Sequence, residues 1–170
     1  MSKVSSLDVA NWFMNNKLDN PRNTLKGNIK LQKLLFFAQM ISLAKYNELL
    51  FNEEFSAFDN GMVIEDLRLH YKNNPQSLLE IKPSFNEKQI DVLSLTSAIY
   101  GDAEANELSE LSHQFLCWRK YLANSIDQDG YKDKAKSKVP YEELKKEIEL
   151  IKDVLLAHEM LQNNDTSLDY

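Results

Sequence analysis

Apolar residues surround almost the whole of one predicted helix. The stretch NIKLQKLLFFAQMISLAKY, residues 28–46, has a helical pattern with Asn28 as its predicted cap, and apolar side chains fall on nearly every face. A helix that is apolar all round is normally buried by neighbours on most sides. We therefore expect a buried central helix at about residues 30–46, although part of its surface could instead face a partner protein.

Helical periodicity also appears on both sides of this segment. Glycine and proline are scarce, with four of each, and so few helix breakers favour long helices. The pattern predicts further helices that begin near Ser6, Glu65, Ser84, Ala103 and Pro140, the last of them long. Because no composition shift marks a linker, we expect one domain over residues 3–162 and a disordered tail at 163–170.

One short region has an extended pattern. Phe55, Ala57 and Phe58 precede the Asn60-Gly61 pair, which favours a tight hairpin turn. Residues 127–138 are highly charged and predict an exposed loop. The expected fold is therefore mainly α, a compact single-domain helical bundle around the central helix, with a short β/turn element near residues 55–63.

Charge is distributed unevenly along the chain. The formal net charge is −6, which argues against broad nucleic-acid binding. Residues 1–50 carry seven basic and three acidic side chains, whereas residues 51–117 carry four basic and twelve acidic ones. Such polarity can orient a charged partner, or it can reflect ordinary solvated helix faces. The basic N-terminal part leaves nucleic-acid binding as a minor alternative.

Recognisable catalytic motifs are absent from the sequence. The four glycines lie far apart, no HExxH or CxxC pattern occurs, and the three histidines stand alone. His113 and the single cysteine, Cys117, have the i,i+4 spacing of a weak nucleophile pair, but a small buried cysteine is the simpler interpretation. The sequence predicts a protein that is not an enzyme and holds neither cofactor nor metal.

The sequence also lacks an apolar run typical of a signal peptide or a membrane span. A lone cysteine is compatible with the reducing cytosol. We therefore expect a cytoplasmic protein without a membrane partner.

Three blocks of sequence together resemble one known family. They are NIKLQKLLFFAQMISLAKYNELLF at 28–51, FSAFDNGMVIEDL at 55–67 and ELSELSHQFLCWRKY at 107–121. Their order and spacing over roughly residues 5–160 are similar to the Panacea domain, also called SocA-like, of bacterial and phage antitoxins and phage-associated proteins. The chain departs from that pattern at Phe58, Met62 and Ser112, where Trp, Pro and Thr are usual.

The resemblance implies an antitoxin that neutralises a co-encoded toxin by direct protein–protein binding. Some members of the family also present the toxin to a bacterial ATP-dependent protease, which makes an adaptor role a second expectation. The alternative is a phage- or prophage-encoded regulatory protein that binds another protein or nucleic acid without a paired toxin.

The resemblance also suggests residue roles. We expect an exposed partner-binding surface at the hairpin, because exposed aromatic and methionine side chains are effective interface anchors. Its members would be Phe58, Asn60 and Met62. The remaining family-signature residues are expected to be structural: Leu31, Lys33, Leu34, Gly61, His113 and Trp118.

Overall fold

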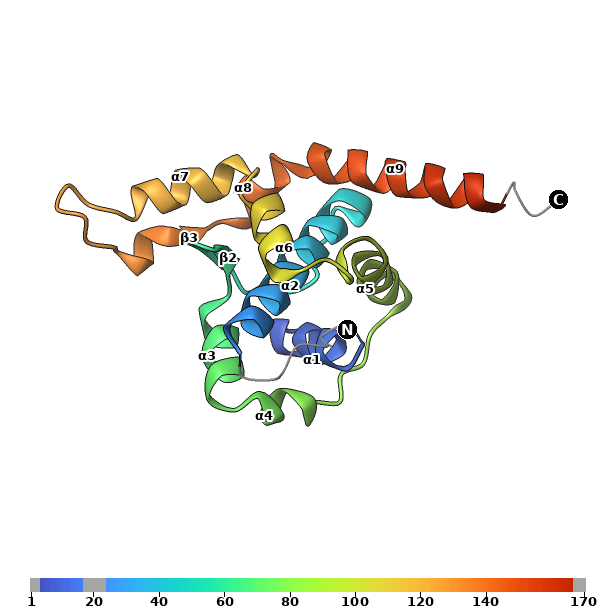
Figure 1. Cartoon of the computed structure of the whole chain (residues 1–170), viewed down its shortest axis with the longest axis horizontal. Coiled ribbons are helices and arrows are strands. Elements are labelled where there is room, and N and C mark those ends of the chain that lie inside the picture. The colour runs from blue at the N-terminus through green and yellow to red at the C-terminus, as the bar shows by residue number, and fades with distance from the viewer. Residues whose placement is uncertain (1–3, 17–23, 167–170) are drawn as a thin grey trace.

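A computed structural model describes residues 4–16 and 24–166 of the chain, and it is mainly α-helical (Figure 1). This confirms the predicted fold class. The helices are α1 (Ser6–Asn16), α2 (Leu25–Tyr46), α3 (Glu65–Asn73), α4 (Pro75–Leu79), α5 (Glu87–Tyr100), α6 (Ala105–Ser112), α7 (Leu116–Asn124), α8 (Tyr141–Lys145) and α9 (Ile148–Thr166). The strands are β1 (Phe55–Phe58), β2 (Gly61–Val63) and β3 (Lys138–Val139), and η1 (Lys134–Ser137) is a short 3-10 helix.

Helix α2 is the buried centre of the molecule. Every residue from 30 to 43 is buried, and α1, α5, α6 and α9 pack around it. The helix begins four residues earlier than the predicted cap implies, because Thr24 rather than Asn28 caps it. The Thr24 side chain accepts a hydrogen bond from the Gly27 N–H. The apolar side chains around this helix therefore pack into the core of the molecule.

Aromatic rings fill the space between α2 and its neighbours. Phe36 meets Phe55 and Phe115 edge to face, with ring centroids 5.5 and 5.0 Å apart. Phe37 stacks on Tyr100 at 4.1 Å. These contacts join the sheet, the central helix and α5 into one core.

The predicted hairpin is present. Strands β1 and β2 pair antiparallel, and Phe58 lies opposite Gly61 across the Asp59-Asn60 turn. Strand β3 adds to the other edge of β1, in the order β2-β1-β3. The expected loop at 127–138 is thus partly wrong, because η1 and the start of β3 lie within it. A two-residue strand that pairs with a distant segment has no local pattern to reveal it.

The long final helix predicted from Pro140 is interrupted, which is a second correction. Helix α8 ends at Lys145 and α9 begins at Ile148. Between them, the Glu147 carboxylate accepts hydrogen bonds from the backbone N–H groups of Leu116 and Cys117, at 2.5 and 2.9 Å, and so caps the start of α7. The break between α8 and α9 thus lies at the residue that caps α7.

Helix α9 projects beyond the rest of the molecule (Figure 1). It continues to Thr166, so residues 163–166, expected in a disordered tail, are helical. Residues 167–170 lie outside the described residues. No helix in the described part of the chain is long and apolar enough to cross a membrane.

Candidate functional site

The hairpin is held to α2 by two polar side chains. The Gln32 amide donates to the Ile64 carbonyl at 3.1 Å and accepts from the Ile64 N–H at 2.8 Å. The Lys33 ammonium donates to the Met62 carbonyl at 2.9 Å. These bonds satisfy backbone groups of Met62, at the outer edge of β2, and of Ile64, the residue after β2. Burial of these groups without partners would be costly.

A second set of contacts holds the hairpin from α6 and α7. The Ser109 hydroxyl donates to the Asn60 carbonyl at 2.9 Å, and the Trp118 indole N–H donates to the Phe58 carbonyl at 2.7 Å. The His113 ring stacks on Trp118, with centroids 3.9 Å apart. The hairpin tip is thus fixed from both sides.

Gly61 allows these elements to come close together. Its φ of +112° is a conformation that L side chains rarely adopt. A Cβ atom there would lie 2.5 Å from the Ser112 hydroxyl oxygen and 2.7 Å from Cε of Lys33. The close approach of α2 and α6 to the turn therefore requires glycine.

Lys33 is a fully buried lysine with an unusual environment. Burial lowers its pKa from 10.5 to about 7, and among the described residues no carboxylate forms an ion pair with it. The pKa of His113 is also lowered, chiefly by burial and then by the positive charge of Lys33. Near physiological pH, the Lys33 amine is therefore partly neutral, and the His113 ring is largely neutral.

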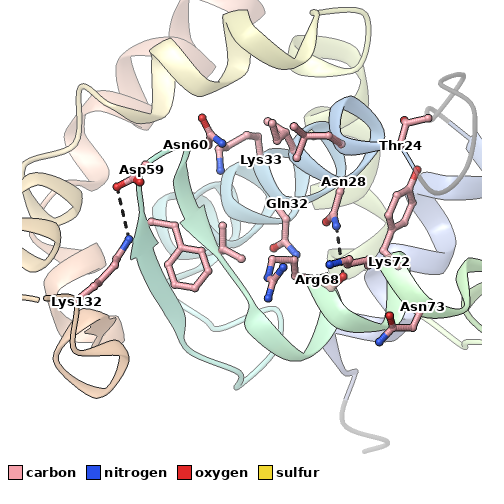
Figure 2. A pocket seen from close by; sticks show the side chains of 15 residues that line it. Thr24, Asn28, Gln32, Lys33, Asp59, Asn60, Arg68, Lys72, Asn73 and Lys132 are labelled. Atoms are coloured by element: carbon pink, nitrogen blue, oxygen red, sulfur yellow. Dashed lines mark hydrogen bonds and ion pairs between the residues drawn. The ribbon is translucent and has the colours of Figure 1, made fainter.

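A pocket of about 560 Å³ opens between the hairpin tip, α2 and α3 (Figure 2). Lys132 reaches it from one side, and Arg68 and Lys72 from the other. Only Asp59 is acidic among its described lining residues, whereas four are basic: Lys33, Arg68, Lys72 and Lys132. The pocket is therefore locally cationic on a protein whose net charge is −6.

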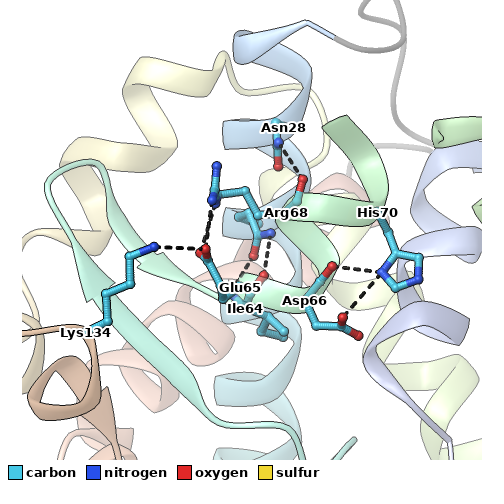
Figure 3. Close-up of polar contacts among 8 residues, drawn as sticks. Asn28, Ile64, Glu65, Asp66, Arg68, His70 and Lys134 are labelled. Carbon is cyan, nitrogen blue, oxygen red and sulfur yellow. Dashed lines mark hydrogen bonds and ion pairs between the residues drawn. The ribbon is translucent and has the colours of Figure 1, made fainter. Parts of the chain in front are cut away.

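Ion pairs at the pocket position some of these cations. Glu65 accepts two hydrogen bonds from the Arg68 guanidinium, at 2.7 and 2.9 Å, and lies 3.5 Å from the Lys134 ammonium (Figure 3). The Lys132 ammonium lies 3.5 Å from Asp59. The Arg68 guanidinium lowers the pKa of Glu65, so that this carboxylate stays ionised and holds the arginine in place.

The structure brings together most of the residues that the sequence singled out. Lys33, Gly61, His113 and Trp118 all surround the hairpin. The other two signature residues, Leu31 and Leu34, are fully buried in the core.

The predicted partner-binding residues divide into two groups. Asn60 is exposed and Phe58 is half-buried, and both line the pocket. The expected exposure of Met62 is wrong: its exposed fraction is 0%, because β2 packs against both α2 and α6. Met62 contributes to the core rather than to an accessible surface.

Several pocket residues were not singled out from the sequence. Asn28, Arg68, Lys72 and Lys132 come from three separate segments. Asn28 begins the first of the three family blocks but was predicted only as a helix cap, and the other three belong to no recognisable motif. Only the fold brings the four to one opening.

The spacing of His113 and Cys117 does not produce a nucleophile pair. The His113 ring faces Trp118, whereas the Cys117 thiol is buried and interacts with Glu147. Burial, and then this carboxylate, raise the thiol pKa, the opposite of what an activated cysteine needs. Within the described residues, no group of three or more His, Cys, Asp or Glu side chains could hold a metal ion.

Comparison with known families gives one result. The sequence model of the family described as antitoxin SocA-like, Panacea domain, matches residues 31–119, which are 89 of the 170 residues. The matched segment contains most of the central helix, the hairpin and the histidine–tryptophan stack. Neither a curated protein nor a solved structure shows significant similarity to the chain.

Proposed function

The chain belongs to the family of SocA-like antitoxins with a Panacea domain, and from this membership we propose that it neutralises a co-encoded toxin by direct protein–protein binding. Family membership is the single observation that carries the proposal.

The hairpin tip is the surface that we propose for contact with the toxin. Its backbone is fixed by Lys33, Ser109 and Trp118, so little conformational entropy remains to be lost when a partner binds. Phe58 offers a half-exposed aromatic ring, and the Lys132 ammonium lies 4.9 Å from its centroid. A rigid aromatic anchor beside a cavity is typical of interface hot spots.

A neutralisation assay tests the function and the surface together. The gene adjacent to this one is expressed alone and with the protein, and growth is followed. We expect co-expression to relieve toxicity, and Phe58→Ala to weaken the complex by about tenfold or more because it removes the central anchor. The matched control is Leu161→Ala, which truncates an exposed side chain on α9 and should leave neutralisation unchanged.

Two results would reject the proposal. One is a toxic neighbour whose effect persists at full co-expression, with no complex in a pull-down. The other is recovery of an unrelated protein or nucleic acid with no toxic neighbour, which would support a phage-derived regulatory protein instead.

The adaptor role is a separate extension of the same family membership. If the protein presents its toxin to an ATP-dependent protease, the toxin half-life in cells should shorten when the protein is present and recover when the protease is deleted. An unchanged half-life would limit its action to direct neutralisation.

A further inference from the structure

The pocket beside the hairpin has the features of a small-molecule site. Its volume of about 560 Å³ lies in the range of clefts that hold cofactors and metabolites. From its charge, its walls and its unpaired acceptor, we propose that this pocket binds a phosphate-bearing small molecule of the nucleotide class.

The charge of the pocket selects an anion. Arg68, Lys72 and Lys132 are cationic side chains in its lining. Glu65, near the pocket, pairs with Arg68, and Asp59 pairs with Lys132. Lys72 is exposed and forms no ion pair within the described part of the chain, so one accessible cation remains without a carboxylate. Several converging cations suit the multiple charges of a phosphate chain better than a single carboxylate.

The walls of the pocket suit a ligand that also carries a ring. Phe58 presents aromatic surface, and Ile29 and Val63 add aliphatic surface next to the cationic groups. An inorganic ion alone would leave this apolar part uncovered. A nucleotide presents a planar base to such walls and its phosphates to the cations.

Asn28 supplies a specific reason to expect a donor on the ligand. Its amide N–H group donates to the Arg68 carbonyl at 3.3 Å (Figures 2 and 3), which directs the side chain toward α3. Its side-chain oxygen is buried and accepts no hydrogen bond from the described residues. An unpaired buried acceptor is costly, so we infer that this side chain turns toward the pocket on binding, where an amino group of a base or a hydroxyl of a ribose would satisfy it.

The buried lysine gives binding a measurable signature. Since the pKa of Lys33 is about 7, its amine is largely neutral at about pH 8. A phosphate close to it favours the charged form and raises that pKa. Binding should therefore take up a proton from the buffer.

Isothermal titration calorimetry of the isolated protein tests the proposal without any toxin, so its outcome is separate from that of neutralisation. The probes are ATP, pyrophosphate and adenosine, at about 50 mM NaCl, where charge screening is weak. We expect ATP to bind more tightly than pyrophosphate, because it also fills the apolar part, and adenosine to bind at least about tenfold more weakly than ATP. Because the two buffers have different enthalpies of ionisation, proton uptake should make the apparent binding enthalpy differ between titrations in Tris and in HEPES.

Variants locate the site. Lys72→Gln removes an exposed cation, and Asn28→Asp replaces the unpaired amide by a carboxylate of the same shape; each should weaken ATP binding by about tenfold. Lys152→Gln makes the same charge change as Lys72→Gln on α9 and should leave affinity unchanged. Lys33→Met should abolish proton uptake, and circular dichroism of each variant checks that it is folded.

The proposal is overturned if ATP and pyrophosphate fail to bind wild-type protein at up to about 1 mM. It is also overturned if both bind but Lys72→Gln and Asn28→Asp have no effect, because binding then occurs elsewhere. If an acidic peptide such as hexaglutamate binds and the phosphate compounds do not, the pocket takes an acidic protein segment instead.

Discussion

Substitution of Gly61 by alanine should destabilise the protein through two separable effects. At a φ of +112°, an L side chain strains the backbone by about 1–3 kcal/mol. The added Cβ would also lie 2.5 Å from the Ser112 hydroxyl oxygen and 2.7 Å from Cε of Lys33, both in buried side chains. Overpacking of this kind costs a further 1–3 kcal/mol or so, which gives a total of about 2–6 kcal/mol.

Gly130 provides a matched control for the backbone part of this cost. Its φ is +84°, yet a Cβ atom there would meet nothing within 4 Å. Gly130→Ala should therefore show backbone strain without the steric contact. The difference in unfolding free energy between the two variants isolates the contact of the turn with Lys33 and Ser112.

Thermal unfolding and urea unfolding, both followed by circular dichroism, measure the melting temperature and the unfolding free energy of each variant. Since 1 kcal/mol shifts the melting temperature of a domain of this size by about 2–4 °C, Gly61→Ala should melt at least about 4 °C below wild type. It should also melt below Gly130→Ala. Equal destabilisation of the two variants would refute the argument that packing of α2 and α6 on the turn demands glycine at position 61.

Three further predictions concern buried polar and titratable groups. Trp118→Phe keeps a ring next to His113 but loses the indole hydrogen bond to the hairpin, so it should lower the unfolding free energy by about 1 kcal/mol in urea titrations. The folded pKa of Lys33 is depressed to about 7 from 10.5, so the unfolded chain binds more protons between these values. The stability of wild type relative to Lys33→Met should therefore rise by about 2 kcal/mol from pH 7 to pH 9, and parallel pH profiles would contradict this. The Cys117 thiol, buried and with a raised pKa, should react with iodoacetamide at least about a hundredfold more slowly in the native state than in urea.

Local patterns predicted the parts of the fold that local interactions determine. The apolar circumference of residues 30–46 identified the buried helix, because a chain rarely places so many apolar groups in water. The Asn60-Gly61 pair identified the hairpin, because its turn needs a positive φ at glycine. In both cases the signal lies within a few turns or residues of the element that it specifies.

The parts that depend on contacts between distant segments left no such signal. In the sequence, Glu147 is one more acidic residue of the long helix predicted from Pro140, whereas in the structure it caps α7, about thirty residues earlier. The pocket draws Asn28 from α2, Arg68 from α3 and Lys132 from the segment before η1. Their proximity is a property of the packed chain, and no spacing in the sequence encodes it.

The hairpin explains why three separate blocks of sequence carry the family resemblance. Lys33 comes from the first block, Gly61 from the second, and His113 and Trp118 from the third. Gly61 lies at the end of the turn, and the other three residues pack around it. The blocks therefore report how the hairpin is held, which every member with this fold needs, rather than which partner it binds. Met62, where the chain departs from the family pattern, is buried and affects packing; Phe58, the other departure in the hairpin, reaches the surface at the pocket. A difference in partner choice should accordingly arise at Phe58 and not at Met62.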